Sequence, residues 1–128
     1  MIISFTMERE RFSIKKRILS FKYAGKGFLA LVKTEHNSWI HLAVTACVIG
    51  AGFIWKVSVT EWCLLVLCIG MVISAEALNS AIEALADKVC KENDQLIGKA
   101  KDLGAFAVLF LSIVAVCVGL LIFLPKIL

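Results

Sequence analysis

The stretch EALNSAIEALAD, residues 76–87, decides how this chain is organised. It ends a long apolar run that begins near Trp62 and contains neither Gly nor Pro after Gly70, so the helical pattern continues through it. At about 100° per residue, its polar side chains share one helix face: Glu76, Asn79, Glu83 and Asp87. Acids and an amide in one row on a membrane helix are energetically costly, and such a row usually marks function.

The composition predicts an all-α membrane protein. Hydrophobic residues make up 60% of the 128 residues, and the mean hydropathy is +0.89, which is improbable for a soluble core of this size. We expect one domain with two regions, a basic amphipathic surface helix in residues 1–34 and a three-span membrane part in residues 35–128. No cleavable signal peptide is expected, because the charges follow the first apolar residues. The five cysteines form no CxxC pair, so neither a disulfide nor a zinc site is indicated.

The first region combines eight Lys and Arg residues with interspersed aromatic and aliphatic side chains. Ile14, Ile18 and Phe21 lie at helical spacing. This pattern favours an interfacial helix on an anionic membrane surface. The alternative is a disordered basic tail.

Three membrane-spanning helices are expected over residues 37–55, 61–89 and 102–124. Aromatic residues bracket the first span, and Thr60 is the predicted N-cap of the second. Residues 90–101 are expected to form a polar loop. Pro125 should end the third span.

The basic residues predict the orientation. Eight of the 14 Lys and Arg residues precede Glu35, and four more lie around the polar loop, which three spans place on the same side. The positive-inside rule makes that side cytoplasmic. We therefore expect the amino terminus in the cytoplasm and the carboxyl terminus outside.

This topology brings the polar ends of all three spans to one interfacial layer. The groups that meet there are Glu35, Glu76, Asn79, Glu83, Lys101 and Asp102. Carboxylates suit Mg²⁺, which also binds substrate phosphates, and a lysine can hold a phosphate. The more deeply set Glu76 suits a general base. Together these groups favour phosphoryl transfer from a cytosolic nucleotide to a hydroxyl in the membrane.

Each of these groups also has a simpler interpretation. Asn79 alone would be a hydrogen bond between helices, and Lys101 alone would satisfy the positive-inside rule. Asp102 could cap a helix, and Asp87 is better explained as a solvated helix end. The histidines His36 and His41 give too weak a signal for a metal site. Residues 25–30, GKGFLA, match a dinucleotide motif, but no strand precedes them, and there is no P-loop.

The stretches EALNSAIEALAD (76–87) and AKDLGAFAVL (100–109) resemble the signature of the prokaryotic diacylglycerol kinase and undecaprenol kinase family. The resemblance covers nearly the whole chain from about Lys15. TEHNSWIHL, residues 34–42, and FLPKIL, residues 123–128, look more like the undecaprenol branch. His41, Lys16 and Gln95 depart from the diacylglycerol branch, which bears on the lipid and not on the reaction.

The resemblance implies a bacterial plasma-membrane kinase that acts as a homotrimer with shared active sites. It uses ATP and Mg²⁺ to phosphorylate a membrane lipid. Carried over to this sequence, the resemblance makes Glu76 the base on the lipid hydroxyl, with Glu35 and Glu83 holding Mg²⁺ and ATP. The remaining implied site residues are Asn79 as an orienting group, Lys101 on phosphate, Asp102 on nucleotide or substrate, and Tyr23 near the adenosine.

The leading hypothesis is phosphorylation of undecaprenol to undecaprenyl phosphate, and the alternative within the class is diacylglycerol to phosphatidic acid. A second class is a small transporter with Glu76 as proton carrier. A third is a membrane scaffold without catalysis. The clustering of Glu35, Glu83, Lys101 and Asp102 on one side favours the kinase over both.

Overall fold

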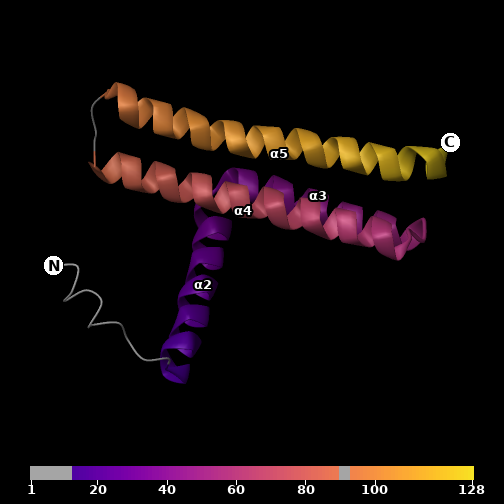
Figure 1. The fold of residues 1–128 in the computed structure, drawn as a ribbon, viewed down its shortest axis with the longest axis horizontal. Helices are drawn as coiled ribbons and strands as arrows, with labels where there is room; N and C mark the ends of the chain where they lie inside the picture. Colours follow the sequence, from indigo (N-terminus) through magenta and orange to yellow (C-terminus); the bar gives the residue numbers. More distant parts are fainter. Residues whose placement is uncertain (1–12, 90–92) are drawn as a thin grey trace, which may run out of the picture. The chain divides into compact units, whose positions relative to one another are not determined.

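The structure is a computed structural model that describes residues 13–89 and 93–128. The predictions for residues 1–12 and for Cys90, Lys91 and Glu92 fall outside these ranges. The described residues form four helices, α2 to α5, and no strand (Figure 1). The expected all-α class is therefore confirmed.

Helix α2, Ile14–Thr34, is a unit of its own. Ile14, Ile18 and Phe21 lie on one stripe of this helix, and Lys15 and Lys22 lie to one side of it. The residues 14–34 are therefore an amphipathic helix and not a disordered tail. That this helix lies on a membrane surface stays a prediction.

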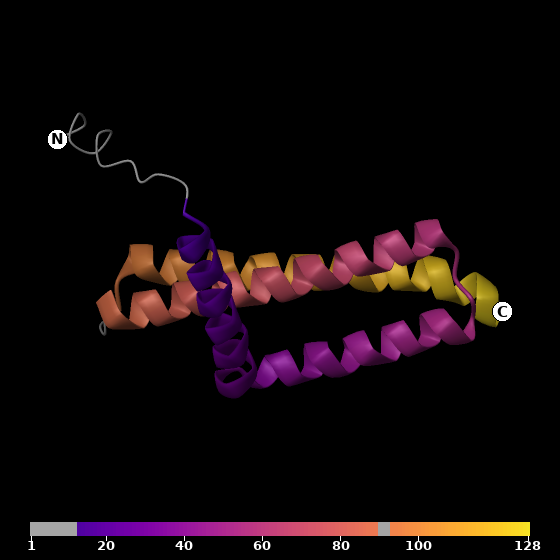
Figure 2. The same ribbon diagram turned by 90° about the horizontal axis from the view of Figure 1, so that it is seen from below.

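The second unit contains α3, His36–Ile54, α4, Val59–Val89, and α5, Gln95–Ile127. All three helices are long and apolar enough to cross a membrane. Helix α4 packs along the antiparallel α5, and α3 packs more sparsely on α4 (Figures 1 and 2). The polar row on α4 therefore faces a close neighbour on one side and a loosely packed helix on the other.

The predicted starts of α4 and α5 were wrong, because capping side chains determine where each helix begins. Ser58, not Thr60, caps α4: its hydroxyl accepts from Glu61 N at 3.2 Å, and its own backbone N–H donates to Glu61 Oε1 at 2.9 Å. This reciprocal pair is a capping box. Asp94 caps α5 by accepting from the backbone N–H groups of Leu96 and Ile97, so residues 95–101 are helical and not loop.

Pro125 does not end α5, which continues to Ile127. The N–H of Leu128 donates to the Leu124 carbonyl at 2.9 Å, closing a final turn around the proline. Proline removes one hydrogen bond to the residue four positions earlier, and its ring crowds that residue's carbonyl, so the disturbance falls on the last turns of α5.

The densest apolar packing lies at the end of this unit away from residues 76–87. Val57, Leu65 and Ile122 are buried there, with Trp62 against them. The Trp62 ring lies over Gly52, where a side chain would collide with it. A half-exposed ion pair between Lys126 Nζ and Glu61 Oε1, 3.1 Å apart, fixes the end of α5 to the start of α4.

Candidate active site at the polar end of the helices

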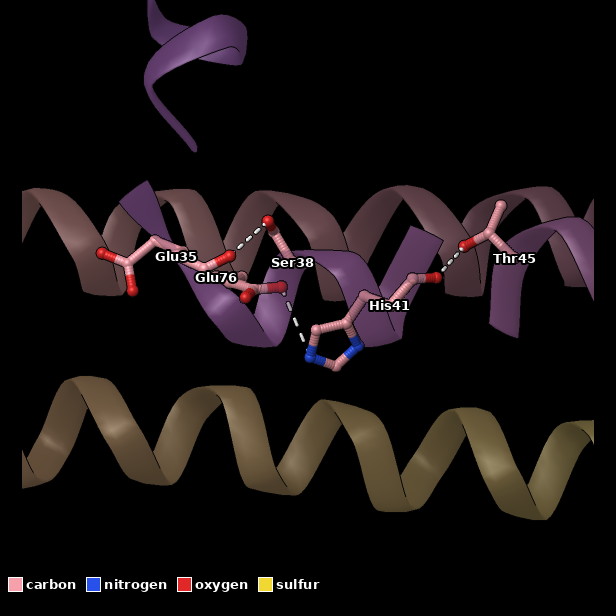
Figure 3. A network of polar contacts seen from close by, with 5 residues as sticks. All are labelled: Glu35, Ser38, His41, Thr45 and Glu76. Atoms are coloured by element: carbon pink, nitrogen blue, oxygen red, sulfur yellow. Dashed lines mark hydrogen bonds and ion pairs between the residues drawn. The ribbon is translucent and has the colours of Figure 1, made fainter. Parts of the chain in front are cut away.

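The centre of the site is Glu76, a buried acid on α4. Glu76 is only 5% exposed, which is unusual for an acid on a helix with apolar neighbours. Its Oε2 lies 3.3 Å from Nε2 of His41 on α3 (Figure 3). Its Oε1 is buried and has no hydrogen-bond partner among the residues that the structure describes. One oxygen of the carboxylate therefore has a polar contact, and the other is buried and without a hydrogen-bond partner in the described chain.

The start of α3 brings a second acid toward Glu76. Glu35 immediately precedes the helix in an extended conformation and is half-buried. The Ser38 hydroxyl donates to the Glu35 carbonyl at 2.6 Å and stabilises this first turn (Figure 3). Glu35 lies within electrostatic range of Glu76, as expected for two acids at one interfacial layer.

Asn79, one turn beyond Glu76, lies against α5. A side chain added at Gly104 would overlap Asn79 Oδ1 and lie 3.3 Å from its Cγ. Gly104 therefore lets the two helices approach closely enough to enclose the amide. Asn79 Oδ1 is itself buried without a hydrogen-bond partner among the described residues.

The last turns of α4 meet the first turns of α5 through charges. Lys101 Nζ lies 2.7 Å from Asp87 Oδ1 in a largely exposed pair and is also within electrostatic range of Glu83. Asp87 was expected to be a solvated helix end; it is exposed, but it also has this partner. Asp102 is exposed on α5.

Tyr23 belongs to α2, a unit described by itself. Its ring lies 5.8 Å from Nζ of Lys26 on the same helix. Its predicted proximity to adenosine stays a prediction.

An apolar cavity of about 440 Å³ lies between α3, α4 and α5. His41 contributes an imidazole to its lining, Thr45 and Ser112 contribute hydroxyls, and Cys68 contributes a thiol. Val72 and Ile73, one turn before Glu76, also line it. The cavity thus lies beside the imidazole that contacts the buried acid, and it suits a hydrocarbon chain.

The predicted carboxylate ligands can bind Mg²⁺ only if a substrate supplies further oxygen ligands. Glu35 and Glu83, the predicted ligands, carry the hard carboxylate oxygens that Mg²⁺ prefers. Within residues 13–89 and 93–128, no group of three or more His, Cys, Asp or Glu side chains could surround an ion. A bound Mg²⁺ would therefore take its other oxygens from phosphates and water, as Mg²⁺ commonly does.

Sequence reasoning missed the contact between His41 and Glu76, as well as the Asp87 partner of Lys101. A signal for the first was present, because a carboxylate within a membrane helix needs a polar partner. His41 is the histidine of α3 beyond its first turn. The relative rotation of α3 and α4, which brings the two together, cannot be derived from spacing within one helix.

The fold and the site define a membrane protein with three apolar helices and a cluster of reactive groups at one end. Residues 22–123, well over half of the chain, match the family described as prokaryotic diacylglycerol kinase. Undecaprenol kinase of Bacillus subtilis (strain 168) is 39% identical over 84% of this chain and 87% of its own. Diacylglycerol kinase of Escherichia coli (strain K12) is 35% identical over 70% of this chain and 85% of its own. Diacylglycerol kinase of Synechocystis is 33% identical over 87% of this chain and 64% of its own.

The chain belongs to the prokaryotic diacylglycerol kinase family. It is a membrane-bound lipid kinase, and the resemblance recognised in residues 76–87 is confirmed. A kinase of this kind uses ATP as co-substrate. The transporter and scaffold hypotheses are set aside by this membership.

Proposed function

We propose that this enzyme transfers the γ-phosphoryl group of ATP to the terminal hydroxyl of undecaprenol, with Glu76 as general base. The observation that carries the proposal is the Glu76 carboxylate. It is buried, its Oε1 has no hydrogen-bond partner in the described chain, and its contact His41 lines an apolar cavity. A carboxylate in this position can accept a proton from an alcohol whose chain lies in the membrane.

The reaction proceeds by one displacement. Glu76 Oε1 accepts the proton of the lipid hydroxyl while the hydroxyl oxygen attacks the γ-phosphorus. The bond from that phosphorus to the β,γ-bridging oxygen breaks, ADP leaves, and the lipid becomes a phosphate monoester. The chain contributes the proton acceptor and the orientation of both substrates.

Glu35 and Glu83 hold the metal–nucleotide complex in this proposal. They lie on either side of Glu76 along the chain, and Glu83 is about 10 Å farther along α4 at about 1.5 Å per residue. The bound Mg²⁺ supplies charge neutralisation for the phosphates. Asn79, enclosed against Gly104, orients the reacting groups between Glu76 and Glu83.

Lys101 contacts phosphate and Asp102 contacts nucleotide or lipid substrate. The pairing of Lys101 with Asp87 is exposed, so the ammonium group can exchange this partner for a phosphate at small cost. Tyr23 lies near adenosine in the proposal.

We also propose a homotrimer whose active sites are shared between subunits, with the amino terminus in the cytoplasm and the carboxyl terminus outside. The distribution of charge supports this orientation. Lys88, Lys99 and Lys101 lie near the polar end of the three-helix unit, and Lys56 and Lys126 lie at the other.

Diacylglycerol is the second candidate substrate, because the family description and several relatives carry that name. The greater identity with an undecaprenol kinase favours the polyprenol. Purified protein in mixed micelles, supplied with γ-labelled ATP and either lipid, separates the two. Label in neither lipid would refute both proposals, and label in diacylglycerol alone would replace the first with the second.

A further inference from the structure

The imidazole of His41 lies between two different surroundings. On one side Nε2 is 3.3 Å from Glu76 Oε2, and on the other the residue lines the apolar cavity. The side chain of Glu76 is 7% exposed and that of His41 is 23% exposed. The contact is therefore largely sheltered from solvent, where a polar contact to a charged group is stronger than at a surface.

The backbone of His41 has a side-chain partner within α3. The Thr45 hydroxyl donates to the His41 carbonyl at 2.7 Å, one turn farther along the helix (Figure 3). Figure 3 also shows the ring of His41 and the carboxylate of Glu76 directed toward one another from neighbouring helices. Since α3 packs only sparsely on α4, this polar contact is a substantial part of what relates the two helices at the site.

The two oxygens of Glu76 are therefore unequal. Oε2 faces His41, and Oε1 is buried without a hydrogen-bond partner in the described chain. Without the imidazole, the carboxylate would be free to rotate about its terminal torsion, which is broad for glutamate. A base must be within hydrogen-bond reach of the proton that it removes, so its rotation matters directly to the rate.

We infer that His41 is a positioning residue: it holds Glu76 by Oε2 so that Oε1 points at the lipid hydroxyl. This inference rests on the proposed role of Glu76 as base. His41 itself accepts no proton from the substrate. Its contribution is orientation, and a donor nitrogen at the same place is what the geometry requires.

The test compares His41→Leu with His41→Gln in the full-length enzyme. Leucine fills the apolar side of the site but offers no donor, and glutamine offers an amide N–H within reach of Glu76. His36→Gln, an exposed position in the first turn of α3, is the matched control. Initial rates are measured with saturating lipid and varied MgATP.

We expect His41→Leu to lower kcat on the order of 100-fold, as misplacement of a reacting group does. KM for ATP should not change, because His41 contacts the base and not the nucleotide. His41→Gln should recover most of the loss, and His36→Gln should match the wild type. An unchanged KM for ATP also shows that the Leu variant is folded.

Three results would overturn the inference while leaving the proposed function intact. They are a wild-type kcat for His41→Leu, a loss in His41→Gln equal to that in His41→Leu, and a loss expressed only in KM for ATP. If the wild-type enzyme labels neither lipid, the proposed function fails and this inference fails with it.

Discussion

Gly104→Ala tests the packing that positions Asn79. The added methyl group would overlap Asn79 Oδ1, with Asn79 Cγ at 3.3 Å and Ile82 Cδ1 at 3.6 Å. The amide must therefore move, since both helices are continuous at this point. Overpacking of this kind costs about 1–3 kcal/mol.

Alanine also favours a helix over glycine by about 1 kcal/mol, which offsets part of that cost. Gly98→Ala removes this ambiguity, because it lies on the same helix and an added side chain there meets nothing within 4 Å. The two alanine variants should therefore differ in stability by about 1–3 kcal/mol, with Gly104→Ala the less stable. Resistance to SDS-induced unfolding in mixed micelles, followed by tryptophan fluorescence, measures the difference.

The same substitution should lower kcat, because a misplaced orienting group costs on the order of 100-fold. The same substitution should also be made in an Asn79→Ala variant, because that variant lacks the side chain with which the added methyl group would overlap. In that background Gly104→Ala should be neutral or stabilising, a coupling that a double-mutant cycle detects. Equal stability of Gly104→Ala and Gly98→Ala, together with wild-type kcat, would refute the close packing of Asn79 on α5.

Three further outcomes follow from the site. Glu76→Gln should abolish lipid phosphorylation while ATP still binds, as measured by equilibrium dialysis; substantial turnover would remove the assignment of the base. Lys101→Met should raise KM for ATP, whereas Asp87→Asn, which breaks the same exposed pair, should change KM little; equal effects would mean that the pair itself is what matters. Glu61→Gln keeps the capping group but weakens the ion pair with Lys126, so it should cost no more than about 1 kcal/mol in an SDS titration and leave kcat unchanged.

The sequence predicted the helices well where the pattern is long. Three apolar runs predicted three spans, and all three are helices of sufficient length. The errors lie at helix ends, where single side chains decide. Asp94 can cap a helix or lie in a loop, and only its bonds to Leu96 and Ile97 N–H groups distinguish the two. Likewise Ser58 and Thr60 are both acceptable caps, and the partnership with Glu61 selects Ser58.

For the site, spacing along α4 predicted the shared face of Glu76, Asn79 and Glu83 because the helical period alone determines it. The partners from other helices depend on the rotation of each helix about its axis, which packing decides. Gly104 shows this limit: the sequence does not distinguish it from Gly50, Gly70 and Gly119, where an added side chain meets nothing within 4 Å, and does not say which residue Gly104 approaches.

Glu76 and Glu83 on α4 differ by environment as much as by depth. Glu76 is buried with a histidine at one oxygen, and Glu83 is half-buried and within range of Lys101. An unpaired buried oxygen costs about 1–3 kcal/mol, so each one in a native structure calls for a partner, such as a substrate, an ion or a water molecule. In the described chain the two such side-chain oxygens are Glu76 Oε1 and Asn79 Oδ1, one turn apart. In the proposed mechanism, the lipid hydroxyl is the group that both would meet. Glu83, beside a cation and nearer solvent, is assigned to the nucleotide in that proposal, a division that would suit a kinase joining a membrane substrate to a cytosolic one.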